Sequence, residues 1–131
     1  MKKKTKRSVN KWIAKNQKEE YIGIHLIADF WGGKIIKNSK EIEKILIESA
    51  IIAQNTPLKV SIHKFPNKGI TGVILLAESH IAVHSWPEFD YLAIDIFTCG
   101  KKSFPYKALD YLIESFQPQK VKIKEIKRGK L

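Results

Sequence analysis

The chain has 131 residues, a length that fits one domain with one hydrophobic core. No stretch approaches the roughly 18 apolar residues of a membrane span, and no apolar segment follows the basic N-terminus as in a secretory signal, so a cytoplasmic protein with no membrane partner is expected. The net charge of +11 comes from residues 1–20 and 120–131, because positive and negative residues are equal in number over 21–119, and nucleic acid is therefore not an expected partner.

The first half of the chain predicts a strand, a helix and a second strand. Residues 21–31 are mostly apolar and read as a strand that stops at Gly32-Gly33. A helix begins at Ser39 as its N-cap, shows apolar residues at helical spacing and ends before Thr56-Pro57. Apolar and polar residues then alternate over residues 58–63, which is typical of a strand.

The second half predicts three strands, a helix and a last strand. The three strands lie over residues 72–77, 80–86 and 91–98. The helix follows, with Pro105 in its first turn, and residues 121–126 form the last strand, a lysine-flanked edge strand. This order predicts an α+β fold, a two-layer sandwich of a mostly antiparallel sheet with two helices on one face. We expect residues 1–20 to be a basic N-terminal extension and residues 21–131 to be a single domain.

The strands on either side of residues 87–90 predict a hairpin with two unlike faces. If Trp86 pairs with Tyr91, Glu78 and Ser79 lie opposite Cys99 and Thr98. Because side chains alternate, one face is apolar and should pack on the helices: Ile81, Val83, Leu92, Ile94 and Ile96. The other face is aromatic and polar, and it suits a site or a contact with a second subunit: His80, Ala82, His84, Trp86, Tyr91, Ala93, Asp95 and Phe97.

Taken singly, these residues say little about function. Cys99 is the single cysteine and cannot form an internal disulfide, and a lone cysteine is usually inert. A histidine on a strand is usually structural. No metal is expected, because no ligand constellation is formed by the four histidines, His25, His63, His80 and His84.

The joint spacing resembles the prokaryotic S-adenosylmethionine decarboxylase proenzyme family. The resemblance rests on Leu76-Ala-Glu-Ser-His-Ile-Ala-Val-His-Ser-Trp-Pro-Glu88 followed by Asp95-Ile-Phe-Thr-Cys-Gly100. It extends to residues 23–30, 63–65 and 71–73 and to the Lys-Arg-Gly ending. It implies a pyruvoyl-dependent decarboxylase that cuts its own chain and makes the aminopropyl donor for spermidine synthesis.

The resemblance assigns the chemistry of self-cleavage to four residues. The chain would be cut between Glu78 and Ser79, and Ser79 would become the pyruvoyl cofactor that forms a Schiff base with the substrate amine. His84 would be the base that removes the Ser79 α-proton, and Cys99 would return a proton after decarboxylation. Thr71 would assist cleavage at a position where the family usually has serine.

The same mapping implies a nucleoside site and a homodimer of processed protomers. Phe65 and Ile22 would sandwich the adenine, Glu88 would hold the ribose hydroxyls, and Trp86 would form another wall. Two alternatives stay open at this point. One is a related pyruvoyl-dependent arginine or ornithine decarboxylase, and the other is a basic RNA-binding module without enzymatic activity.

Overall fold

The computed structural model describes residues 20–131, so almost all of the basic extension over residues 1–20 lies outside the described part. The order is the one predicted, strand, helix, four strands, helix and strand, with one turn of 3-10 helix between the fourth and fifth strands. The elements are β1 (Gly23–Trp31), α2 (Ser39–Ile52), β2 (Pro57–Lys64), β3 (Ile70–Leu76), β4 (Ser79–Trp86), η2 (Pro87–Phe89), β5 (Tyr91–Cys99), α3 (Pro105–Phe116) and β6 (Lys120–Arg128).

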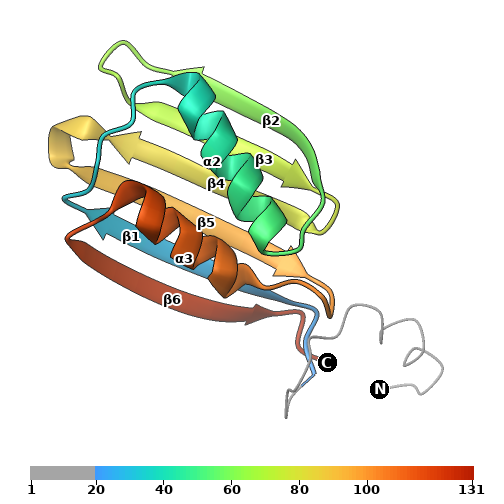
Figure 1. The fold of residues 1–131 in the computed structure, drawn as a ribbon. Coiled ribbons are helices and arrows are strands. Elements are labelled where there is room, and N and C mark those ends of the chain that lie inside the picture. The colour runs from blue at the N-terminus through green and yellow to red at the C-terminus, as the bar shows by residue number, and fades with distance from the viewer. Residues whose placement is uncertain (1–19) are drawn as a thin grey trace.

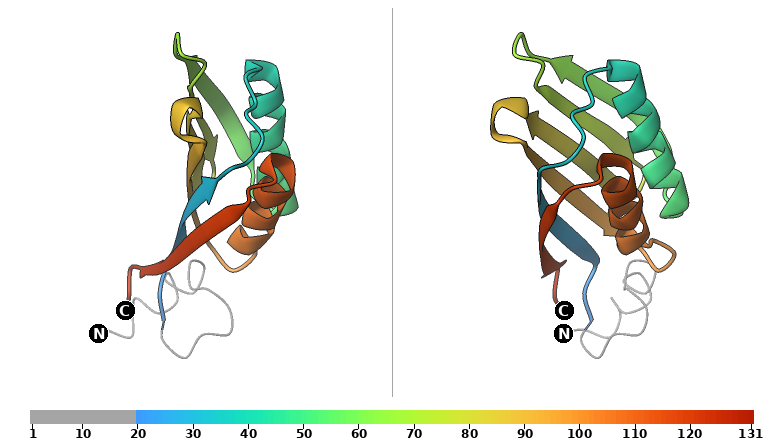
Figure 2. Two further views of the ribbon diagram at one scale, coloured as in Figure 1. Left: turned by 90° about the vertical axis from the view of Figure 1, so that its left-hand side faces the viewer. Right: turned by 60° about the vertical axis from the view of Figure 1, so that its left-hand side comes forward.

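The described strands form one six-stranded antiparallel sheet in the order β2-β3-β4-β5-β1-β6. Helices α2 and α3 lie side by side on one face, and among the described residues no element covers the other face (Figures 1 and 2). The predicted two-layer α+β sandwich is therefore confirmed. The edge position predicted for the last strand is also confirmed, since β6 borders the sheet beside β1.

The predicted hairpin register is observed between β4 and β5. Trp86 pairs with Tyr91, and Ser79 pairs with Thr98. The short loop fixes this register, because η2 ends at Asp90, whose φ of 50° lies in the left-handed region. The face predicted to pack on the helices does so: Ile81, Val83, Ile94 and Ile96 are buried in the core, and Leu92 packs against it.

The N-terminus of helix α2 differs from the sequence prediction. Asn38, not Ser39, is the N-cap, and its side-chain oxygen accepts hydrogen bonds from the backbone N–H groups of Lys40 and Glu41. Both residue types are good N-caps, and Asn38 takes the position because its extended backbone lets the amide reach the free N–H groups of the first turn. Pro105 stands at the start of α3 as predicted.

No helix within residues 20–131 is both long and apolar enough to cross a membrane.

Candidate functional site

The uncovered face of the sheet carries the candidate site residues. Along β4 and β5 it presents the alternating set predicted from the sequence, from His80 to Trp86 and from Tyr91 to Phe97. Large apolar side chains on this side stay open to solvent, since Leu75 is 52% exposed and Trp86 is 40% exposed. The residues assigned by resemblance fall into two clusters at opposite ends of the central strands.

The cleavage cluster consists of Ile22, Glu78, Ser79 and Cys99. Ser79 opens β4, Cys99 ends β5, and Ile22 precedes β1, in which Gly23 pairs with Cys99. The Cys99 thiol donates a hydrogen bond to the backbone carbonyl of Glu78 over 3.0 Å. A donor on the carbonyl oxygen withdraws electrons from the carbonyl carbon, so this contact favours attack by a nucleophile at the Glu78–Ser79 peptide bond.

The electrostatics of Cys99 suit a proton donor. Burial raises the pKa of the Cys99 thiol above its ordinary value, and the nearby Glu78 carboxylate raises it further. Because the ordinary pKa is already above neutrality, the thiol keeps its proton at pH 7.

Ser79 has an unusual backbone. A two-residue hairpin loop that matches the strand twist needs positive φ at its centre, where Gly, Asn or Asp is preferred. The β3–β4 loop instead contains Ala77 and Glu78, and neither has a positive φ. The positive φ falls on Ser79, at 151°, a region that a residue with a Cβ rarely adopts. The strain therefore lies at the residue whose hydroxyl is the expected nucleophile.

The groove cluster consists of Phe65, Thr71, His84, Trp86 and Glu88. All five line one surface groove, together with Asn67, at the end of the face where β2 and β4 stop. His84 Nδ1 and Thr71 Oγ1 are 3.4 Å apart across the β3–β4 pair. The indole of Trp86 stacks on Tyr91, with ring centroids 5.5 Å apart. A flat aromatic wall, a carboxylate and an imidazole therefore meet in one open groove.

One chain does not bring the two clusters together. Ser79 and His84 are the first and sixth residues of β4, so their α-carbons are about 17 Å apart at the strand rise of ~3.3 Å per residue. Ile22 and Phe65 likewise lie at opposite ends, because Ile22 adjoins the Ser79 end and Phe65 follows β2 at the Trp86 end. Within one chain, His84 is not in reach of Ser79, and Ile22 cannot face Phe65 across a ligand.

The structure adds residues that the sequence analysis did not single out. His80 Nδ1 lies 3.3 Å from Ser79 Oγ, and the Glu-Ser-His run was a signal for it. Asn67 donates hydrogen bonds from its amide to both carboxylate oxygens of Glu88, at 3.3 and 3.1 Å. These two bonds hold Glu88 at the rim of the groove, and no local pattern pairs residues 21 positions apart.

A hydrogen-bonded row of side chains from β6, β1 and β5 lies beside the cleavage cluster. His25 Nε2 is 2.5 Å from Asp95, and Arg128 Nη1 is 3.0 Å from His25 Nδ1. Since a guanidinium only donates, Nδ1 accepts from Arg128 and Nε2 carries the proton shared with Asp95. Tyr91 donates a hydrogen bond to Asp29. The burial of Tyr91 and this hydrogen bond together raise its pKa to about 12.

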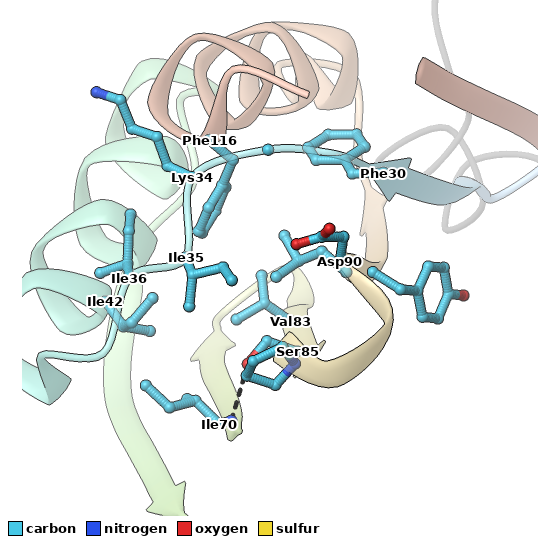
Figure 3. A pocket seen from close by; sticks show the side chains of 14 residues that line it. Phe30, Lys34, Ile35, Ile36, Ile42, Ile70, Val83, Ser85, Asp90 and Phe116 are labelled. Carbon is cyan, nitrogen blue, oxygen red and sulfur yellow. Dashed lines mark hydrogen bonds between the residues drawn. The ribbon is translucent and has the colours of Figure 1, made fainter. Parts of the chain in front are cut away.

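A second pocket lies on the other side of the sheet (Figure 3). Its walls are mainly apolar side chains from the sheet, the loop before α2 and the helices, including Phe30, Ile42, Val83 and Phe116. The backbone N–H of Ile70 donates to Ser85 Oγ at its lower edge. Because Val83 and Ile42 belong to the core, this pocket lies on the helix side of the sheet, and Ser85 lines both the pocket and the groove. Among residues 20–131, no three His, Cys, Asp or Glu side chains are grouped to hold a metal ion.

Comparisons with known proteins agree on one family. The family model for S-adenosylmethionine decarboxylase matches residues 24–129. The chain is 43% identical to the S-adenosylmethionine decarboxylase proenzyme of Acetivibrio thermocellus over 110 residues, 82% of this chain and 89% of that protein. It is 42% identical to the Clostridium kluyveri proenzyme, covering 82% and 87%. The crystal structure of the Aquifex aeolicus adenosylmethionine decarboxylase superposes with a TM-score of 0.77 at 34% identity, covering 83% of this chain and 92% of that one.

Proposed function

The chain belongs to the S-adenosylmethionine decarboxylase family and is a decarboxylase, and we propose that it cuts itself between Glu78 and Ser79, converts Ser79 to a pyruvoyl group and acts on S-adenosylmethionine. The observation that carries this proposal is the geometry of the Glu78–Ser79 bond. Its carbonyl oxygen accepts a hydrogen bond from the Cys99 thiol, and its serine has a φ of 151°. Both features fit a chain that makes its pyruvoyl group at this position.

Self-cleavage proceeds through an ester. Ser79 Oγ attacks the Glu78 carbonyl carbon, and the peptide nitrogen takes up the hydroxyl proton as the C–N bond breaks. A base removes the Ser79 α-proton, the Cβ–Oγ bond breaks, and the fragment ending at Glu78 leaves as a carboxylate. Water then displaces ammonia from the new N-terminus of fragment 79–131 and leaves the pyruvoyl group. His80 is within reach of the hydroxyl in the first step, and His84 is the proposed base for the α-proton.

We propose that two copies form a homodimer by packing their uncovered faces together. The two clusters lie at opposite ends of β4, so a two-fold axis between them brings the cleavage cluster of each copy to the groove cluster of the other. This arrangement gives Ser79 a base from the second copy, and it places Ile22 of one copy opposite Phe65 of the other. The exposed apolar and aromatic side chains of the face support such packing.

In the decarboxylation step, the pyruvoyl group supplies a carbonyl that withdraws the electrons released when carbon dioxide leaves. Cys99, protonated at neutral pH and adjacent to residue 79, is the proposed donor of the proton that replaces the carboxylate. Phe65 and Ile22 offer flat apolar surfaces to the adenine, and Glu88, held by Asn67, accepts from the ribose hydroxyls. Trp86 closes the groove beside them. The product is the aminopropyl donor for spermidine synthesis.

The substrate is tested by measuring carbon dioxide release from equal concentrations of S-adenosylmethionine, arginine and ornithine. We expect S-adenosylmethionine to be preferred, and we expect Phe65→Ala to raise its KM about five- to tenfold, because the variant loses one face of an aromatic stack. Phe89→Ala is the matched control: Phe89 is 70% exposed and does not line the groove, so its KM should not change. Faster turnover of either free amino acid would refute the substrate assignment and leave the pyruvoyl chemistry intact.

Cys99 is expected to act in both reactions. Cys99→Ala removes the donor on the Glu78 carbonyl and should slow self-cleavage by roughly tenfold, the scale of one lost hydrogen bond at a reacting oxygen. Once processed, this variant should decarboxylate about 100-fold more slowly, because the proton donor is absent. Cys99→Ser, which keeps a donor, should cleave faster than Cys99→Ala. The two rates are read by intact mass and by carbon dioxide release, and wild-type decarboxylation by the alanine variant would rule out the proton-donor role.

A further inference from the structure

Thr56 makes three hydrogen bonds to the two residues that precede the cleavage point. Its backbone N–H donates to Glu78 Oε1 over 2.9 Å, and its hydroxyl donates to Glu78 Oε2 over 3.0 Å. Its carbonyl accepts from the backbone N–H of Ala77, also over 3.0 Å. One residue thus holds both members of the β3–β4 loop, with the Glu78 carboxylate gripped by two donors. Thr56 and Glu78 are 22 positions apart in the chain.

Thr56 is itself held in place by the end of helix α2. The backbone N–H of Asn55 bonds to the carbonyl of Ala50, and its side-chain amide donates to Ser103 over 2.6 Å. Pro57 follows Thr56 and restricts its backbone to extended conformations. The N–H, hydroxyl and carbonyl of Thr56 therefore project from a fixed support, not from a loose loop.

A fixed loop matters at this position because the residues of the β3–β4 turn do not themselves keep Ser79 in its strained conformation. Ala77 and Glu78 lack the conformational freedom of a Gly or Asn turn, and a free loop would relax the φ of 151° at Ser79. Cys99 restrains only the Glu78 carbonyl. Thr56 restrains the Glu78 side chain and the Ala77 backbone, so Thr56 and Cys99 together hold the Glu78 side of the peptide bond to be cut.

We propose that Thr56 is a positioning residue for self-cleavage, which keeps the Glu78–Ser79 bond in its strained, attack-ready geometry by gripping Glu78. This inference rests on the proposed self-cleavage. Thr56 contacts neither the reacting carbonyl nor the Ser79 hydroxyl, and it acts through Glu78. Its loss should slow the formation of the cofactor and leave the finished enzyme's turnover unchanged.

The test compares Thr56→Val, which removes the hydroxyl and keeps the shape, with Thr56→Ser, which keeps the hydroxyl. Uncleaved chains from a short expression pulse are incubated at a temperature well below unfolding, and the cleaved fraction is followed by intact mass. We expect Thr56→Val to cleave about three- to tenfold more slowly, since it loses one bond to an exposed carboxylate, and Thr56→Ser to stay within about twofold of wild type. Glu78→Gln, which keeps one acceptor oxygen, should also be slow, and adding Thr56→Val to it should cost little more.

The possible outcomes test the proposed self-cleavage and the role of Thr56 separately. A wild-type chain that never cleaves refutes the proposed function itself. A wild-type chain that cleaves, with Thr56→Val equally fast, refutes only the role of Thr56, and so does a Thr56→Ser variant as slow as Thr56→Val. If Thr56→Val does not fold, as judged by its melting temperature, the cleavage rate of Glu78→Gln decides: a wild-type rate overturns the inference.

Discussion

Replacing Ser79 with alanine is expected to abolish self-cleavage completely. The variant retains the Cys99 thiol beside the Glu78 carbonyl but has no hydroxyl to attack it, and no other step in the sequence can start without the ester. Intact mass should show a single chain of 15.1 kDa after long incubation. The wild-type chain should separate into fragments 1–78 and 79–131, the second lighter by one ammonia than a fragment that starts with serine.

The control is an exposed serine outside both clusters. Ser61 lies on β2 and is exposed, so Ser61→Ala should cleave like the wild type. Equal melting temperatures of the two variants would show that the Ser79→Ala chain is uncut because of its chemistry, not because it is misfolded. Fragments from Ser79→Ala cut at the same bond would mean that a contaminating protease, not the chain itself, does the cutting.

The second large effect is rescue between two inactive chains. His84→Ala retains Ser79 but lacks the proposed base, and it should cleave at least about 100-fold more slowly than wild type. Ser79→Ala retains His84 but cannot be cut. Because His84 is about 17 Å from Ser79 of its own chain, the proposal requires that His84 of the other copy acts as the base. Co-expression at equal levels makes about half of the dimers mixed, and in these the His84→Ala chain should be cleaved.

The two chains carry different affinity tags, so the masses of the fragments show which chain is cut. The matched control is the Ser79→Ala/His84→Ala double variant, which offers the same partner surface without the base and should rescue nothing. Sequential affinity steps recover the mixed dimers. If the His84→Ala chain in these dimers stays uncut, the result contradicts a site shared between copies. Normal cleavage by His84→Ala alone would move the base role to His80, whose Nδ1 is 3.3 Å from Ser79 Oγ.

The sequence alone determined most of the local structure and indicated the family. Alternation of apolar residues along residues 80–98, with a short loop between, was enough to set the pairing of Ser79 with Thr98 and to separate core side from open side. The order of elements and the two-layer class followed from the same periodicities. The spacing from Glu78 to Cys99 was enough to indicate the family, because many specific residue types at fixed offsets seldom coincide by chance.

Part of the site's geometry was also present in the sequence. Ser79 and His84 are five residues apart on one predicted strand, and the strand rise separates them whatever the rest of the fold does. If His84 removes the Ser79 α-proton, as the resemblance implies, it must therefore belong to a second copy of the chain.

Only the tertiary structure decided which distant segments meet. The sheet places β1 between β5 and β6, which brings Ile22 beside Cys99 and Arg128 onto His25. Thr56 reaches Glu78 only because helix α2 ends at the same end of the sheet as the β3–β4 loop. Such pairings depend on the packing of strands and helices far apart in the chain, and periodicity within a segment carries no information about its neighbours. For the same reason the positive φ of Ser79 could not be read from its residue type: Ser79 follows a turn whose Glu78 is contacted by Thr56 and Cys99, two residues from distant segments.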